Sequence, residues 1–294
     1  MTMKKAMELL RGAIDLHVHS GPGLIPRSVD HVEAARQCLE SGMKGLILKD
    51  HHFMTCNQVY FFKKYIFRDA PLAILGGLAL NNPLGGLNPF AVSTAIGYGA
   101  KIIWMPTLSA KNHIEHHKKE ETFFSAHQRK DMEETPLTIL DREGKLLPQV
   151  SQICGQIAKA DIILATGHLH ISEIKALVQE ALRLGVKKIL INHPEFLIDA
   201  SIGDMIDLAG KGAFIEHSYT LTLSKKLTKE YLAEMIRKVG AEHTIIGSDL
   251  GQTGRVTPVE GLRNCIQELL EMGIKDEEID LMFRKNPAKL LDLA

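Results

Sequence analysis

The sequence predicts an α/β fold, a (β/α)8 TIM barrel of regular or distorted shape, which forms one domain over residues 1–294. Eight short apolar runs alternate with segments of helical periodicity, and six of those runs end in a histidine or an aspartate. A strand buried on both faces is typically an apolar run, and the carboxyl ends of barrel strands converge on one face. These polar residues are therefore expected to meet in one site.

The apolar runs are the expected strands, at residues 13–18, 43–50, 72–80, 100–106, 161–167, 187–193, 212–217 and 243–249. The segments between them include expected helices at 29–40, 171–184, 201–210, 227–238 and 258–272. In the helix at 171–184, Ser172 can act as the N-cap, and Gly185 ends the helix. Its buried stripe is expected to consist of Ile174, Leu177, Val178, Ala181 and Leu182.

An open, doubly wound sheet is the alternative arrangement of these elements. It is disfavoured because no GxGxxG motif follows the first strand. The candidate ligands also lie on too many strands for a single crevice at a switch point.

A long insertion, residues 108–148, interrupts the alternation between the fourth and fifth strands, where a connection usually needs only a few residues. It contains a polar part at 112–131 and a predicted hairpin at 137–147. The histidines of this part are expected to form a solvated face: His113, His116, His117 and His127. Since the insertion follows the carboxyl end of a strand, we expect a lid or a subunit contact, and the second would make the chain a homo-oligomer.

Composition excludes several classes of function. Lys and Arg total 35 and Asp and Glu total 35, so the chain has no net charge, and neither nucleic acid nor a membrane is expected as a partner. The four cysteines contain no CxxC pair, which speaks against a disulfide framework or a thiolate metal site. No signal peptide and no run of ~18 apolar residues is recognisable. A cytoplasmic protein is expected.

The strongest chemical signal is the pair His17 and His19 at the end of the first strand. Side chains two positions apart on a strand point to the same face, so both imidazoles can reach one ion. Asp15 precedes the pair and a Gly-Pro-Gly segment, residues 21–23, follows it. This context predicts a metal site rather than two surface histidines.

Other strand ends supply further candidates. The predicted metal ligands are His17, His19, His51, His168, His193 and Asp249. The predicted contacts to substrate or to the ligands are Lys49, Asp50, His52, Glu216, His217 and Arg255. Arg27 and Arg255 follow the first and last strands. They are either ordinary loop cations or residues that bind a carboxylate or phosphate group of a ligand. His170 is expected at the surface of a helix entry.

These motifs resemble the amidohydrolase superfamily, and the match spans nearly the whole chain. It includes residues 15–19, His168, His193, the Gly-Ser-Asp ending at Asp249, and the tail at 286–291. The resemblance implies that the histidines and Asp249 bind one or two divalent ions. It also implies that Asp249 takes a proton from metal-bound water, and His193 is assigned a catalytic role beside it.

Two features depart from that pattern. The end of the fourth strand has Trp-Met-Pro-Thr at 104–107 instead of a bridging Lys or Glu. Residues 15–20 and 49–52 are similar to the motifs of the polymerase-and-histidinol-phosphatase (PHP) phosphoesterases. That family closes with an Asp-x-His motif, whereas Asp249 is followed by Leu and Gly. By analogy with the PHP motif, His51 is favoured over His52 as the metal ligand. Lys49 is either an ordinary cation or a carboxylated bridge.

The sequence thus predicts a metal-dependent hydrolase that uses activated water on an amide, ester or lactone bond of a small molecule. Imidazole and carboxylate donors make Zn²⁺ the simplest choice, with Mn²⁺, Fe²⁺, Co²⁺ or Ni²⁺ open. The alternatives are a PHP-like phosphoesterase and a metal-dependent decarboxylase. A non-enzymatic metal-binding scaffold is the remaining class.

Overall fold

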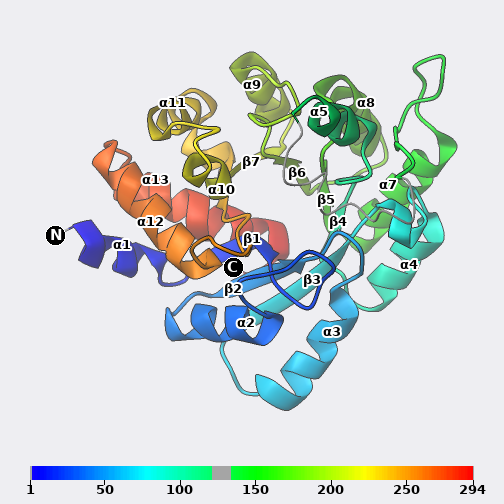
Figure 1. The fold of residues 1–294 in the computed structure, drawn as a ribbon. Coiled ribbons are helices and arrows are strands. Elements are labelled where there is room, and N and C mark those ends of the chain that lie inside the picture. Colours follow the sequence, from blue (N-terminus) through cyan, green and yellow to red (C-terminus); the bar gives the residue numbers. More distant parts are fainter. Residues whose placement is uncertain (1, 121–133, 294) are drawn as a thin grey trace.

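The computed structural model describes residues 2–120 and 134–293, which fold into a barrel of eight parallel strands surrounded by helices (Figure 1). The strands follow each other around the barrel in sequence order, each paired with the next. They are β1 (Ile14–His19), β2 (Gly45–Lys49), β3 (Ala73–Ala79), β4 (Ile102–Trp104), β5 (Ile163–Ala165), β6 (Ile189–Asn192), β7 (Phe214–Ser218) and β8 (Thr244–Gly247). The (β/α)8 prediction is confirmed.

Helices fill the connections between successive strands. The main ones are α1 (Thr2–Leu10), α2 (His31–Glu40), α3 (Cys56–Phe61), α4 (Pro89–Gly97), α5 (Lys111–Glu120), α7 (Pro148–Ala160), α8 (Ile171–Arg183), α9 (Ile202–Gly210), α10 (Tyr219–Leu223), α11 (Lys229–Val239), α12 (Pro258–Glu271), α13 (Asp276–Asp280) and α14 (Asn286–Leu291). Single turns of tighter or wider helix are η1 (Phe62–Ile66), η2 (Asn82–Leu84), η3 (Ala241–His243) and η4 (Leu281–Lys285).

The barrel closes where the chain beyond β8 meets β1. The His19 N–H donates to the Leu250 carbonyl at 2.9 Å, and the Asp249 N–H donates to the His17 carbonyl at 2.9 Å. The pairing of β1 with β2 shifts register between Asp15 and Val18, so β1 carries a bulge beside His17. This seam places the ends of the first and last strands in contact, which is the position of the predicted site.

Apolar residues form two layers of core. One fills the barrel interior and includes Ile14, Trp104 and Ile245, while the other lies between the strands and the surrounding helices. Helix α14 covers the amino-terminal end of the barrel, where the Asn286 side chain donates to the Ala241 and Thr244 carbonyls at 2.8 and 2.7 Å. Because this end is closed by packed side chains, the opposite end alone is free for a cavity.

The described parts of the insertion fold back over the barrel. The Asn112 side chain of α5 donates to the carbonyls of His168 and Leu197, which ties α5 to the loops after β5 and β6. The predicted hairpin is short, with an isolated antiparallel bridge between Leu140 and Leu146. The backbone N–H of Ile139 and the hydroxyl of Thr138 both donate to the Glu173 carboxylate at the start of α8.

Two details of the expected α8 differ. The N-cap is His170 rather than Ser172, because the His170 ring accepts a hydrogen bond from the Ser172 N–H and Glu173 bonds back to the cap. Leu182 is 41% exposed, so the buried stripe consists of the other four predicted residues. Within residues 2–120 and 134–293, no helix has the length and hydropathy to span a bilayer.

Candidate metal centre and its cavity

A cavity of about 790 Å³ opens at the carboxyl ends of the strands. Residues at or just beyond these ends line it, including His19 after β1, His51 after β2, His168 after β5 and Asp249 after β8. Catalytic sites of (β/α)8 barrels lie at this face, because eight independent loops surround it there. The volume is in the range of small-molecule sites.

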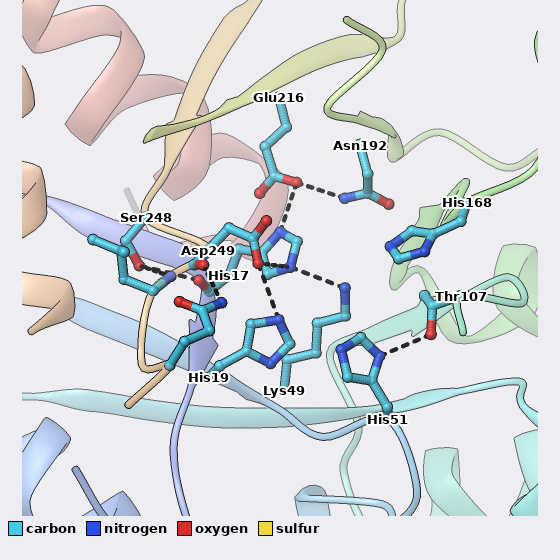
Figure 2. Close-up of polar contacts among 12 residues, drawn as sticks. His17, His19, Lys49, His51, Thr107, His168, Asn192, Glu216, Ser248 and Asp249 are labelled. Atoms are coloured by element: carbon cyan, nitrogen blue, oxygen red, sulfur yellow. Dashed lines mark hydrogen bonds and ion pairs between the residues drawn. The ribbon is translucent and has the colours of Figure 1, made fainter. Parts of the chain in front are cut away.

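Three side chains at the floor of the cavity converge on one point (Figure 2). Asp249 Oδ1 lies 3.3 Å from His17 Nε2 and 3.0 Å from His19 Nε2. Ligands of a tetrahedral ion at bond lengths of about 2.0–2.2 Å are themselves about 3.3–3.5 Å apart. The imidazoles are buried, whereas the Asp249 carboxylate reaches the cavity. In the described part of the chain, no other His, Cys, Asp or Glu joins this group.

Glu216 on β7 fixes the orientation of His17. Its fully buried carboxylate lies 3.1 Å from His17 Nδ1 and accepts a hydrogen bond from the Asn192 side chain at 2.5 Å. The carboxylate favours a proton on Nδ1, so Nε2, the nitrogen that faces Asp249, is the atom available to a metal ion. Such carboxylate–histidine pairs orient metal ligands in proteins.

The backbone at the ends of β8 and β6 is arranged for this packing. A Cβ at Gly247 would lie 2.7 Å from Glu216 Oε1 and 3.1 Å from His17 Cβ, so only glycine allows this approach. Asp249 and His193 adopt positive φ angles of 49° and 27°. Non-glycine residues rarely adopt this conformation, and it persists where surrounding contacts impose it, often at functional sites.

Electrostatics favour an anionic Asp249. Burial raises the pKa of Asp249, but the facing imidazoles of His17 and His19 outweigh it, and the net shift is downward. Burial lowers the pKa of His19 well below its usual value. A carboxylate and uncharged imidazole nitrogens are the protonation states in which these groups bind a cation.

Lys49 on β2 lies beneath this group rather than in the cavity lining. Its Nζ is 2.9 Å from His17 Nε2 and 5.2 Å from the centre of the Trp104 ring, and the side chain is buried (Figure 2). Burial lowers the pKa of Lys49 to about 8. The ammonium therefore donates to the lone pair that Glu216 directs toward Asp249.

Further imidazoles line the cavity beside these three residues. The His51 ring stacks on His19 with centroids 4.8 Å apart, and the His168 and His193 rings are 4.9 Å apart. Burial lowers the pKa of all three rings. These predicted ligands thus face the same cavity as the converging group, without belonging to it.

The expectation that the insertion histidines form a solvated face is wrong for two of them. His113 and His117 are each 3% exposed and line the cavity. His113 Nδ1 is 2.8 Å from His168 Nδ1. The missed signal is their spacing of four, which places both rings on one side of a helix. His127 lies outside the described residues.

Asp50, His52 and His217, like Lys49 and Glu216, are not among the residues that line the cavity. Asp50 accepts the backbone N–H groups of His52 and Phe53 and so holds the turn after β2. His52 lies half-buried beside it, 3.9 Å from the Asp50 carboxylate. His217 Nδ1 pairs with the buried carboxylate of Glu195 at 3.0 Å. Arg255, in contrast, is exposed and lines the mouth of the cavity.

Several solved structures share this fold. An amidohydrolase from Pseudomonas aeruginosa matches with a TM-score of 0.66 at 12% identity, covering 99% of this chain and 98% of the other. A phosphotriesterase homology protein from Escherichia coli, with phosphate in its active site, has a TM-score of 0.57 at 14% identity, covering 96% and 99%. A 2,6-dihydroxybenzoate decarboxylase, in complex with 2,6-dihydroxybenzoate, has a TM-score of 0.57 at 13% identity, covering 96% and 99%.

The fold is therefore that of amidohydrolase and phosphotriesterase-like TIM barrels. The chain belongs to the family of unknown function DUF6282, whose profile matches residues 12–216. That range contains His17, His19 and Glu216 but ends before Asp249. No curated protein matches the chain.

Proposed function

We propose that this protein is a metal-dependent hydrolase that acts on an amide, ester or lactone bond of a small molecule. The observation that carries the proposal is the convergence of His17 Nε2, His19 Nε2 and Asp249 Oδ1 at the floor of a cavity. Glu216 adds support because it directs the His17 lone pair toward the same point. The named activities of similar structures, an amidohydrolase and a phosphotriesterase homology protein, are consistent with hydrolysis.

The donor set fits a divalent ion. Two imidazole nitrogens and one carboxylate oxygen, at separations suited to tetrahedral coordination, would hold it, with Zn²⁺ the simplest choice and Mn²⁺, Fe²⁺, Co²⁺ or Ni²⁺ alternatives. Such an ion supplies Lewis acidity, which lowers the pKa of water and polarises a carbonyl or phosphoryl oxygen. His51, His168 and His193 are further donors that face the cavity, and a second ion would be held by these.

The protein's own groups supply the proton transfers. Asp249 presents its carboxylate to the cavity and is the proposed proton acceptor. His193 is a second acceptor, since its buried Nδ1 has no hydrogen-bond partner in the described residues. Lys49 now donates to the Nε2 lone pair of His17, so its ammonium must turn away when that nitrogen binds an ion.

A decarboxylase is the second candidate. It is favoured by Arg27 and Arg255, which line the cavity and can hold a carboxylate, and by the likeness to a decarboxylase structure. A phosphoesterase would use the same basic residues, and the PHP resemblance of residues 15–20 and 49–52 stays a prediction.

Metal content tests the centre. The purified protein is expected to bind about one equivalent of Zn²⁺, and Asp249→Asn is expected to weaken that binding more than about 100-fold, because a ligand matters more than its outer-shell partners. Asp207→Asn is the control, since Asp207 pairs only with Lys211 on the surface. A metal-free wild-type protein, or unchanged affinity in Asp249→Asn with a native circular dichroism spectrum, would contradict the proposal.

Activity then separates the reaction classes. The Zn²⁺-loaded protein is compared on aryl esters, anilides, lactones, aryl phosphates and aromatic carboxylic acids. Turnover of esters, amides or lactones that is lost in Asp249→Asn supports the hydrolase. Release of phosphate alone would indicate a phosphoesterase instead, and release of CO₂ alone would indicate a decarboxylase.

A further inference from the structure

The cavity contains an arginine, Arg27, that forms no direct ion pair with the described residues, although Asp50 and Asp249 attract it from a longer distance. Arg27 follows β1 and lines the cavity beside His19 and Asp249. The side chain is half-buried, its Nε has no hydrogen-bond partner, and no carboxylate of the described residues lies within ion-pair distance of it. A guanidinium remains charged at all physiological pH values, so burial does not remove the charge. An unpaired buried charge is unfavourable unless a ligand completes it.

The backbone holds Arg27 in this position. Arg27 forms an isolated antiparallel bridge with Gln252, and the Ser28 N–H donates to the Gly251 carbonyl at 2.8 Å. Gln252 in turn donates from its side chain to the Asp249 carbonyl at 2.8 Å. The loops after β1 and β8 are thus joined, which fixes the backbone from which the Arg27 side chain reaches the cavity beside the converging group.

Apart from Asp249, the other charged side chains of the cavity lining have the same sign as Arg27. Lys226, whose ammonium lies 4.3 Å from the centre of the Phe196 ring, and Arg255 line its wall, whereas Asp249 is the one carboxylate of the lining in the described residues. Asp249 is engaged by the two histidines. The field in the cavity therefore attracts anions, and the more so with a divalent cation at its floor.

The uncharged part of the wall is apolar. Ile25, Leu108, Phe196, Leu221 and Val256 contribute to the lining. A ligand that matches this cavity needs an anionic group for the guanidinium and an apolar body for the wall. Arginine suits planar, two-oxygen groups, which carboxylates and phosphates share.

We propose that Arg27 is a specificity-determining residue that binds the anionic group, carboxylate or phosphate, of a substrate with an apolar body. This inference rests on the proposed function for the word substrate, whereas the anion site itself requires no metal. Arg27 holds the anion, and the bond to be cleaved lies toward His17, His19 and Asp249.

Ligand binding tests the inference on the full chain. Benzoate, phenyl phosphate and the neutral benzamide are titrated by calorimetry into EDTA-treated protein and into Zn²⁺-loaded protein. Benzoate or phenyl phosphate is expected to bind both forms, and benzamide more weakly than either. The better of the two anions identifies the group. Failure of all three probes to bind, or benzamide binding as tightly as the anions, would overturn the inference.

Two variants locate the binding. Arg27→Gln is expected to weaken anion binding about 10- to 100-fold, as for loss of a charge-assisted contact. Arg142→Gln is the matched control, because Arg142 lies exposed in the hairpin turn outside the cavity, and it should bind as wild type does. Arg27→Gln should also melt no lower than wild type without ligand, since it removes an unpaired charge.

The outcomes distinguish the two proposals. Anion binding that needs Zn²⁺ and is unchanged in Arg27→Gln would overturn the role of Arg27 and leave the metal centre intact. Anion binding that depends on Arg27 in a protein without metal affinity would support the anion site and contradict the hydrolase.

Discussion

Glu216 offers the sharpest test of how the metal centre is built. Its carboxylate accepts hydrogen bonds from His17 Nδ1 at 3.1 Å and from the Asn192 side chain at 2.5 Å. Glu216→Gln keeps an oxygen acceptor of similar shape and removes only the charge. The His17 ring should therefore stay in place, while the charge-assisted bond that holds its tautomer becomes a neutral one.

The magnitude follows from the difference between those two bonds. Hydrogen bonds to charged groups contribute about 1.5–3 kcal/mol and neutral ones about 0.5–1.5 kcal/mol, a difference of about 1–2 kcal/mol. At about 1.4 kcal/mol for each factor of ten, the dissociation constant for Zn²⁺ should rise about 5- to 30-fold. The metal-free variant should melt somewhat lower than wild type, because His17 and Asn192 outweigh burial and lower the pKa of Glu216, so the folded state favours the charge that the substitution removes.

Competition with a chromophoric chelator measures the affinity, and Glu195→Gln provides the control. The Glu195 carboxylate is also buried and lies 3.0 Å from an imidazole nitrogen, His217 Nδ1. Like Glu216, it has one oxygen without a hydrogen-bond partner. It does not contact His17, so this variant should bind Zn²⁺ as wild type does. Equal affinities for wild type and Glu216→Gln, or equal losses in both variants, would refute the orienting role of Glu216.

Two further predictions concern stability. Burial lowers the pKa of His31 to about 4, so between about pH 6.5 and pH 4 the unfolded state binds a proton that the folded state does not. The free energy of unfolding should therefore decrease by about 3 kcal/mol in total as the pH is lowered through this range. His31→Gln should show a shallower decline in urea unfolding over this range, and an unchanged slope would exclude His31 as its source. Gly251→Ala places a Cβ 1.5 Å from the His19 carbonyl oxygen at a φ of +128°, and should cost at least about 3 kcal/mol. Gly254→Ala in the same loop, at a φ of +82° with open space around it, should cost only about 1–2 kcal/mol, and equal losses would exclude the steric cause.

The sequence alone determined the barrel and the outline of its site. The short apolar stretches within 161–167 and 187–193 are typical of strands covered on both faces, and a parallel barrel brings their carboxyl ends together. The placement of His17 and His19 followed from strand alternation, because both residues lie within β1.

Tertiary structure decided what happens beyond the strand ends, where alternation no longer holds. His51 faces the cavity and His52 does not, because Asp50 binds the backbone of the next turn. Glu216 contacts His17, while its neighbour His217 turns to Glu195.

The same limit applies to the loops. His113 and His117 are buried only because α5 folds back over the cavity, and Arg27 is isolated only because its loop pairs with the one after β8. Contacts of this kind join residues far apart in the chain, such as His113 with His168, and no local pattern encodes them. Periodicity reports which face of an element is apolar, whereas the partner of each polar side chain depends on how the loops pack.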